Sequence, residues 1–133
     1  MKKLLITAVI LALGGCAAKT SPERHSIYYA RHDPTMMGGN YASSPDATAK
    51  ANLPAYKQIY QQGQDAKTKG LTPAQAQTLA DEIYKVNANV TSGTETFMNL
   101  KEHKTQITRD ERASQLWGQT LKETFLDGFN GVK

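Results

Sequence analysis

The residues of this chain that could carry out chemistry are few, and adjacent acidic residues are the first of them. Asp81-Glu82 and Asp110-Glu111 are the carboxylate pairs that general acid-base chemistry could use. Both pairs fall near expected helix N-termini or at exposed positions, where a favourable interaction with the helix dipole accounts for acidic side chains. No serine-nucleophile, zinc-protease or phosphate-loop motif accompanies them. The sequence therefore predicts no enzyme and no catalytic residue.

Histidine side chains could provide nitrogen ligands for a metal ion. His25 and His32 lie close together in the sequence, and Asp33 follows the second, but this spacing matches no zinc signature. His103 lies among charged neighbours, which is typical of an exposed histidine on a helix. We therefore expect no metal site and no cofactor.

Cys16 is the only cysteine of the 133-residue chain, and it follows a segment with the features of an export signal. Two lysines at positions 2 and 3 precede an apolar stretch over residues 4–13, and Gly14 and Gly15 complete the segment. A positive start, a short apolar stretch and small residues at the cut are typical of signal peptides. A membrane-spanning helix would need about 20 apolar residues. We expect cleavage between Gly15 and Cys16, which removes residues 1–15.

The four residues Leu13-Gly14-Gly15-Cys16 resemble the lipobox of bacterial lipoproteins. The resemblance implies that the Cys16 sulfur takes a diacylglyceryl group through a thioether bond, so that lipid holds the protein in a membrane. In enterobacterial lipoproteins an Asp after the cysteine causes retention at the inner membrane. This chain has Ala17 there, which favours the outer membrane, facing the periplasm. The alternative is a soluble secreted protein whose cysteine merely follows the cut.

The charge balance gives no support for a nucleic-acid partner. The formal net charge of +4 includes Lys2 and Lys3 of the signal segment. The other basic residues are dispersed, and no run reaches the roughly five to eight that would indicate a basic patch. Removal of residues 1–15 leaves a chain of the size of one domain. This domain must be stable by packing alone, because a lipidated Cys16 offers no thiol for a disulfide.

Residues 16–52 contain several prolines and glycines among small polar residues, a composition that predicts an irregular, lipidated tether. A flexible chain of this length has a root-mean-square span of about 30 Å. Its apolar side chains are unusual for a solvated linker, so the alternative is an extended arm that lies on the domain or on a partner. Aromatic and methionine side chains are enriched at interfaces. The candidate contact residues are Tyr28, Tyr29, Met36, Met37 and Tyr41.

Residues 53–133 show the apolar spacing that predicts a helical domain. The first helix is expected to begin with Pro54 at its first position and to stop at Gly70. The second is expected to begin at Thr72, whose hydroxyl can cap the helix while Gln75 reaches back to the cap. These signals predict two helices joined by a short turn.

The second helix has two alternative lengths. The apolar spacing continues to Ile107, which favours one helix with a kink near Gly93, whereas residues 87–94 are poor in helix formers and a new helix could start at Ser92. A last helix is expected from a capping box at Thr108 to Gly128. Its predicted core face is Ala113, Leu116, Trp117, Thr120, Leu121 and Phe125. The expected fold class is all-α: a small helical hairpin or bundle of three or four helices, preceded by the irregular N-terminal arm.

A second resemblance covers the arm. Residues 16–25 (CAAKTSPERH), 28–30 (YYA) and 32–41 (HDPTMMGGNY) resemble the small exclusion-protein lipoproteins of colicin-type plasmids, and the likeness continues into residues 49–60. The resemblance implies an envelope lipoprotein associated with excluding the entry of related plasmids, and no catalytic motif comes with it. We expect a non-enzymatic protein that acts by contact with an envelope protein. The alternative is a general envelope scaffold or stress accessory lipoprotein.

Overall fold

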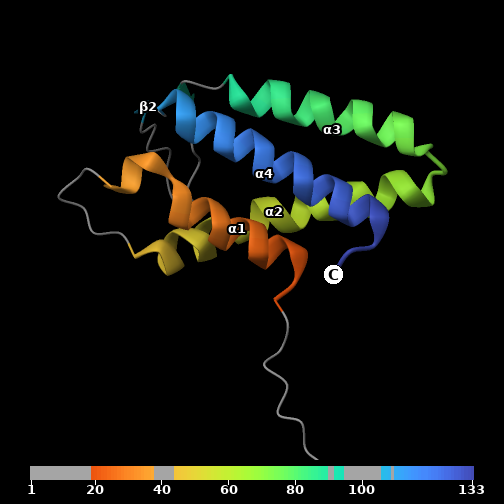
Figure 1. Ribbon diagram of the computed structural model, residues 1–133, viewed down its shortest axis with the longest axis horizontal. Coiled ribbons are helices and arrows are strands. Elements are labelled where there is room, and N and C mark those ends of the chain that lie inside the picture. Colours follow the sequence, from red (N-terminus) through yellow and green to blue (C-terminus); the bar gives the residue numbers. More distant parts are fainter. Residues whose placement is uncertain (1–18, 38–43, 90–91, 95–105, 109) are drawn as a thin grey trace, which may run out of the picture.

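The computed structural model describes residues 19–37, 44–89, 92–94, 106–108 and 110–133. These residues form α1 (Ser21–His32), the 3-10 helix η1 (Pro34–Met37), α2 (Pro45–Thr68), α3 (Pro73–Ala88), the strands β1 (Ser92–Thr94) and β2 (Gln106–Thr108), and α4 (Glu111–Asn130). Helix α4 runs through the middle of the bundle and packs against α1, α2 and α3 (Figure 1). The predicted all-α class is confirmed. None of the helices in these ranges is both long and apolar enough to cross a membrane.

Helix α1 corrects the expectation that residues 16–52 are irregular. Thr20 is its N-cap, and the backbone N–H and hydroxyl of Thr20 both donate to the Glu23 carboxylate, at 2.7 and 2.9 Å. These hydrogen bonds lower the pKa of Glu23 below the ordinary range of a glutamate. Pro22 costs the helix nothing, because N–H groups in the first turn have no partner within the helix. The proline that suggested irregular structure therefore marks a helix start.

Helix α2 begins earlier than predicted. It starts at Pro45 after the N-cap Ser44, and Pro54, the expected first residue, lies in its interior. The boundary expected between residues 52 and 53 therefore falls inside a helix. An interior proline removes one backbone hydrogen bond, and Pro54 lies on the exposed side of the helix. The helix ends where predicted, next to Gly70, whose φ of +80° suits glycine.

The start of α3 confirms the predicted capping box. Gln75 N donates to Thr72 Oγ1 at 3.2 Å, and Thr72 N donates to Gln75 Oε1 at 2.9 Å. The predicted continuation of this helix to Ile107 is wrong, because α3 ends at Ala88. Residues 92–94 instead form β1, which pairs antiparallel with β2 and places Gly93 opposite Ile107. A helix starting at residue 92 is excluded by the same pairing.

Helix α4 has different ends from those predicted. Its N-cap is Asp110, whose carboxylate accepts a hydrogen bond from Arg112 N at 3.2 Å, and Thr108 belongs to β2. Its C-cap is Gly131, with φ of +72°, so Gly128 lies inside the helix.

The glycine inside α4 meets a glycine of α2 where the two helices cross. A Cβ built on Gly128 would lie 2.1 Å from Tyr60 O, and a Cβ built on Gly63 would lie 2.1 Å from Phe125 O. Both helices therefore bring their backbones into near contact, which only residues without a side chain allow.

The core is built around the predicted face of α4, of which Leu116 alone is half-buried rather than buried. Trp117 makes edge-to-face contacts with Tyr29 of α1 and Tyr56 of α2, with ring centroids 5.0 and 5.2 Å apart. Tyr56 Oη and Thr120 Oγ1 are 2.7 Å apart and hydrogen-bonded. Trp117 is thus a core residue, as predicted. A second buried cluster consists of Ala66, Ala76, Ala80, Phe125 and Phe129.

Candidate functional site

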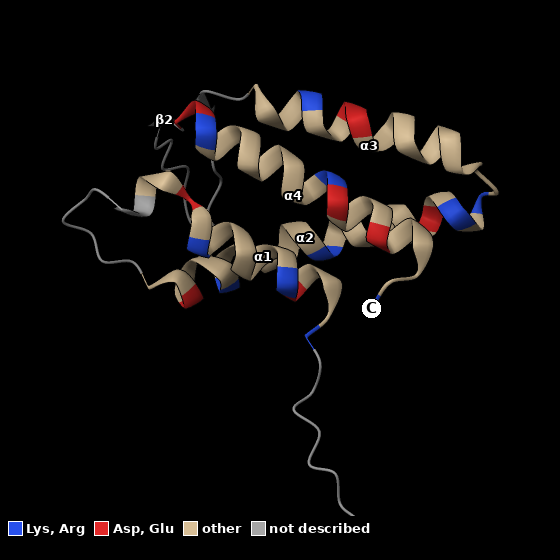
Figure 2. Cartoon of the chain, in the orientation of Figure 1, with Lys and Arg blue, Asp and Glu red and all other residues tan. Residues whose placement is uncertain are grey.

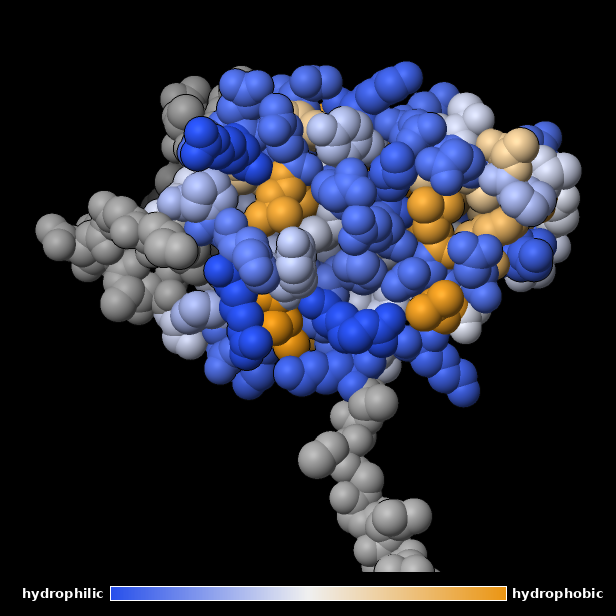
Figure 3. All heavy atoms as spheres, viewed as in Figure 1, coloured by the Kyte–Doolittle hydropathy of each residue, from blue (hydrophilic) through white to orange (hydrophobic). Residues whose placement is uncertain are grey.

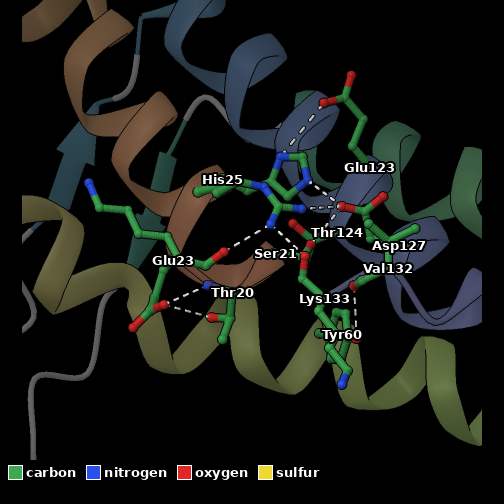
Figure 4. A network of polar contacts seen from close by, with 12 residues as sticks. Thr20, Ser21, Glu23, His25, Tyr60, Glu123, Thr124, Asp127, Val132 and Lys133 are labelled. Carbon is green, nitrogen blue, oxygen red and sulfur yellow. Dashed lines mark hydrogen bonds and ion pairs between the residues drawn. The ribbon is translucent and has the colours of Figure 1, made fainter. Parts of the chain in front are cut away.

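A cluster of polar side chains joins α1 to the C-terminal half of α4 (Figure 4). It consists of Ser21, Arg24 and His25 from α1 with Glu123 and Asp127 from α4, and we call it the α1–α4 polar cluster. The three α1 residues lie in the first two turns of the helix, and the two carboxylates lie one turn apart on α4. Their convergence follows from the packing of α1 along α4.

The Asp127 carboxylate is the centre of this cluster. Ser21 Oγ donates a hydrogen bond to Asp127 Oδ2 at 2.7 Å, and His25 Nε2 lies 3.0 Å from the same oxygen. Arg24 Nη2 lies 3.6 Å from Asp127 Oδ2, and His25 Nδ1 lies 3.7 Å from Glu123 Oε2. A hydrogen bond to a charged group contributes about 1.5–3 kcal/mol, so these contacts stabilise the docking of α1 on α4.

The presence of Ser, His and Asp in this cluster raises the question of nucleophilic catalysis. In a hydrolase triad the serine hydroxyl is hydrogen-bonded to histidine, and the carboxylate binds the far side of the ring. Here Ser21 donates directly to Asp127, and Ser21 is completely buried. A hydroxyl in this position has neither a histidine base nor access to a substrate. The arrangement therefore holds helices together and does not form a triad.

Arg24 also connects the two ends of the described chain. Its Nη1 donates to the carbonyl oxygens of Lys19 and Lys133. Nearby, the Tyr60 hydroxyl donates to Val132 O at 2.9 Å. The chain thus enters the bundle at Lys19 beside the C-terminus, and Figure 1 shows both on the same side of the molecule.

The candidate metal ligands do not converge. His25 faces the carboxylates of α4, whereas His32 stacks on Tyr28, with ring centroids 4.1 Å apart, and its Nδ1 lies 2.8 Å from Tyr28 O. Asp33 accepts hydrogen bonds from Thr35 N and Thr35 Oγ1 at 2.9 and 2.7 Å. Within the described ranges, no group of three or more His, Cys, Asp or Glu side chains is placed to hold a metal ion.

The carboxylate pairs singled out in the sequence lie in different surroundings. Asp81 forms an ion pair with Lys122 of α4, with Nζ and Oδ1 2.6 Å apart. Hydrogen bonds from Lys122 and then from Gln77 lower the pKa of Asp81. Asp110 is the N-cap of α4, and Glu111 follows it in the first turn. Asp110 and Glu111 thus belong to a helix start, and Asp81 contributes to the packing of α3 on α4.

The predicted contact residues lie in different surroundings. The side chain of Tyr28 is 49% exposed, whereas Tyr29 is 4% exposed. Tyr29 therefore follows the alternative in which the arm lies on the domain, because α1 turns its ring into the core against Trp117 and leaves it inaccessible to a partner. Met36 and Met37 belong to η1, but their side chains lie outside the described part, as do Tyr41, Gly15 and Cys16.

The surface around these residues is largely hydrophilic. The face seen in Figure 3 shows small, separate apolar patches surrounded by polar side chains. Apart from Tyr28, the large apolar side chains exposed in the described ranges are Leu79, Val86 and Val132. Tyr28 is the aromatic member of this set, and it lies on a helix that the α1–α4 polar cluster holds in place.

Comparisons of the chain with protein-family models, with curated proteins and with solved structures gave no match.

The sequence did not reveal the α1–α4 polar cluster. A helix start at Thr20 could have been recognised, since Thr20-Ser21-Pro22-Glu23 combines a cap, an early proline and an acidic third position. Glu123 and Asp127 share one face of α4 because they are four residues apart. Their contact with α1 bridges about a hundred residues of chain, which no local pattern can predict.

Proposed function

We propose that this protein is an envelope lipoprotein, anchored through lipid on Cys16, that acts by contact with another envelope protein in excluding the entry of related plasmids. The proposal places it at the outer membrane, facing the periplasm. The lipobox and the resemblance of residues 16–41 to plasmid exclusion lipoproteins support the class. The exposed ring of Tyr28 supports action by contact.

Tyr28 has the properties of an interface residue. Tyrosine offers a large contact area with few rotatable bonds, and aromatic residues are enriched at protein interfaces. The stacking of Tyr28 on His32 orders the ring, and the polar contacts of Ser21 and His25 with α4 order the helix that carries it. A partner would therefore find this side chain already in position, which lowers the entropy lost on binding.

Plasmid transfer into recipient cells tests this proposal. Recipients would express the wild-type protein, Tyr28→Ala or Val86→Ala at matched levels, and the frequency of acquiring a related mobilisable plasmid would be counted. Val86 is a suitable control because it is 69% exposed on α3, a different helix. We expect the wild type and Val86→Ala to lower the transfer frequency and Tyr28→Ala to lose most of this effect.

Two results would contradict the proposal. If the wild type leaves the transfer frequency unchanged, the exclusion function is wrong and the general envelope scaffold replaces it. If exclusion persists in Tyr28→Ala while the protein remains folded, the contact site is not on this face of α1.

A further inference from the structure

The chain between the proposed lipidation site and the folded domain is short. Helix α1 begins at Ser21, and Lys19 is the first described residue. Three residues of fully extended chain span at most about 11 Å, so Lys19 lies within this distance of Cys16. The flexible tether predicted from residues 16–52 would have reached about 30 Å. A lipid on Cys16 therefore holds the Lys19 end of the bundle close to the headgroups.

The surface at this end contains a cavity with both cationic and apolar walls. The cavity lies between α1 and α2 and has a volume of about 280 Å³. Lys19 and Lys50 are exposed residues of its lining, and its apolar part includes Ile27, Ala49 and Leu53. A positive edge above apolar side chains is the combination that amphipathic surfaces present to a bilayer.

The cavity lining carries two lysines and two carboxylates, and a third lysine, Lys57, lies beyond it. Glu23 and Asp46 also line it, but the Glu23 carboxylate already accepts two hydrogen bonds from Thr20. Lys57 follows Lys50 by two turns of α2, and its charge lies close enough to Glu23 to add to the pKa decrease that Thr20 mainly causes. Figure 2 shows basic residues where the N-terminal trace joins α1 and along α1 and α2, with acidic residues among them on both helices. Three lysines thus surround this edge of the bundle.

We propose that the face formed by Lys19, Ile27, Lys50, Leu53 and Lys57, the tether face, rests on the phospholipid headgroups of the membrane that holds Cys16. The lysine ammonium groups lie against lipid phosphates, and Ile27 and Leu53 lie toward the boundary with the acyl chains. The juxtamembrane position of basic side chains strengthens such binding when the lipids are anionic. The inference rests on the proposed lipid anchor and adds an orientation to it.

Fluorescence quenching by labelled lipids tests this orientation. The sulfur of a lipidated Cys16 is blocked, so an introduced cysteine is the single thiol available for a fluorophore. Lys57→Cys places the probe on the tether face, and Lys85→Cys is a matched control at an exposed lysine of α3. Helix α3 lies across α4 from α1 (Figure 1). Each lipidated protein would be inserted into phosphatidylethanolamine–phosphatidylglycerol vesicles that carry spin-labelled headgroups.

We expect the probe at position 57 to lose most of its fluorescence and the probe at position 85 to lose little. Adding Lys50→Glu to Lys57→Cys should reduce the quenching. If the protein floats with the vesicles but both probes are quenched equally, the tether face is wrong and the anchor stands. If the purified protein does not float with vesicles at all, the anchor itself is wrong, and the orientation is wrong with it.

Discussion

The crossing of α2 and α4 makes Gly128→Ala a decisive perturbation. An added Cβ would lie 2.1 Å from Tyr60 O and 2.9 Å from Tyr60 C, where ordinary contacts begin at 3.4 Å. Both atoms belong to backbone, so no side chain can turn away, and the helices must separate by about 1 Å or more. Overpacking of this kind costs about 1–3 kcal/mol and occasionally more, and a backbone clash favours the upper end of this range.

Helix propensity favours alanine at position 128 and so opposes the destabilising clash, which means that the two effects predict stability changes of opposite sign. Alanine in a helix interior is favoured over glycine by about 1 kcal/mol. If Gly128 were not crowded, Gly128→Ala would therefore stabilise the protein. We expect instead a net loss of about 2 kcal/mol, which lowers the melting temperature by roughly 10 °C in a domain of this size. Thermal unfolding of the mature chain, monitored by circular dichroism, measures this decrease in melting temperature.

The control for this experiment is Gln64→Ala, an exposed position beside Gly63 on α2. It should change the stability by no more than about 0.5 kcal/mol. A melting temperature of Gly128→Ala equal to or above that of the wild type would refute the close crossing of α2 and α4.

Two further predictions concern the core and an ion pair. Trp117→Ala removes the ring between Tyr29 and Tyr56 and should lower the free energy of unfolding by about 3–5 kcal/mol in a denaturant melt. Val86→Ala, at an exposed position, should change this free energy little, and equal losses in the two variants would place Trp117 outside the core. Lys122→Ala should leave the melting temperature nearly unchanged, because an ion pair between half-buried side chains at the protein surface contributes little to stability. The same variant should raise the pKa of Asp81 toward the ordinary aspartate range in an NMR titration. Because the folded-state pKa of Asp81 is lowered, the pair contributes to folding stability at pH values above the unfolded-state pKa of Asp81, and this contribution is lost as the pH falls through the folded-state pKa. An unchanged Asp81 pKa in the variant would contradict the pairing.

The sequence predicted those parts of the fold that local patterns determine. The capping box at Thr72, the stop at Gly70 and the buried stripe of α4 each depend on neighbouring residues or on helical spacing, and all were confirmed. The proline and glycine content of residues 16–52 does not predict helix α1, whereas the capping residues Thr20 and Glu23 do. The composition of a segment is thus a weaker guide than the position of each proline within it.

Other features required contacts between distant residues. Apolar spacing continues across Gly93 and Ile107, but β1 and β2 place these two residues opposite each other in a ladder, a pairing that helical spacing cannot show. Glycine at position 128 indicates a helix end from the sequence alone, because its close approach to α2 involves residues far away in the chain. The core contact of Tyr29 with Trp117 likewise depends on α1 being helical and on a residue far away in the sequence.

The lipid on Cys16 is the central claim, because both the proposed function and the tether face depend on it. Cells expressing the wild type or Cys16→Ser would be grown with radiolabelled palmitate, and the protein would be isolated and counted. We predict label on the wild type and none on Cys16→Ser, because a serine hydroxyl cannot replace the thiolate that forms the thioether. Equal labelling of the two proteins, or a wild type without label, would contradict the account.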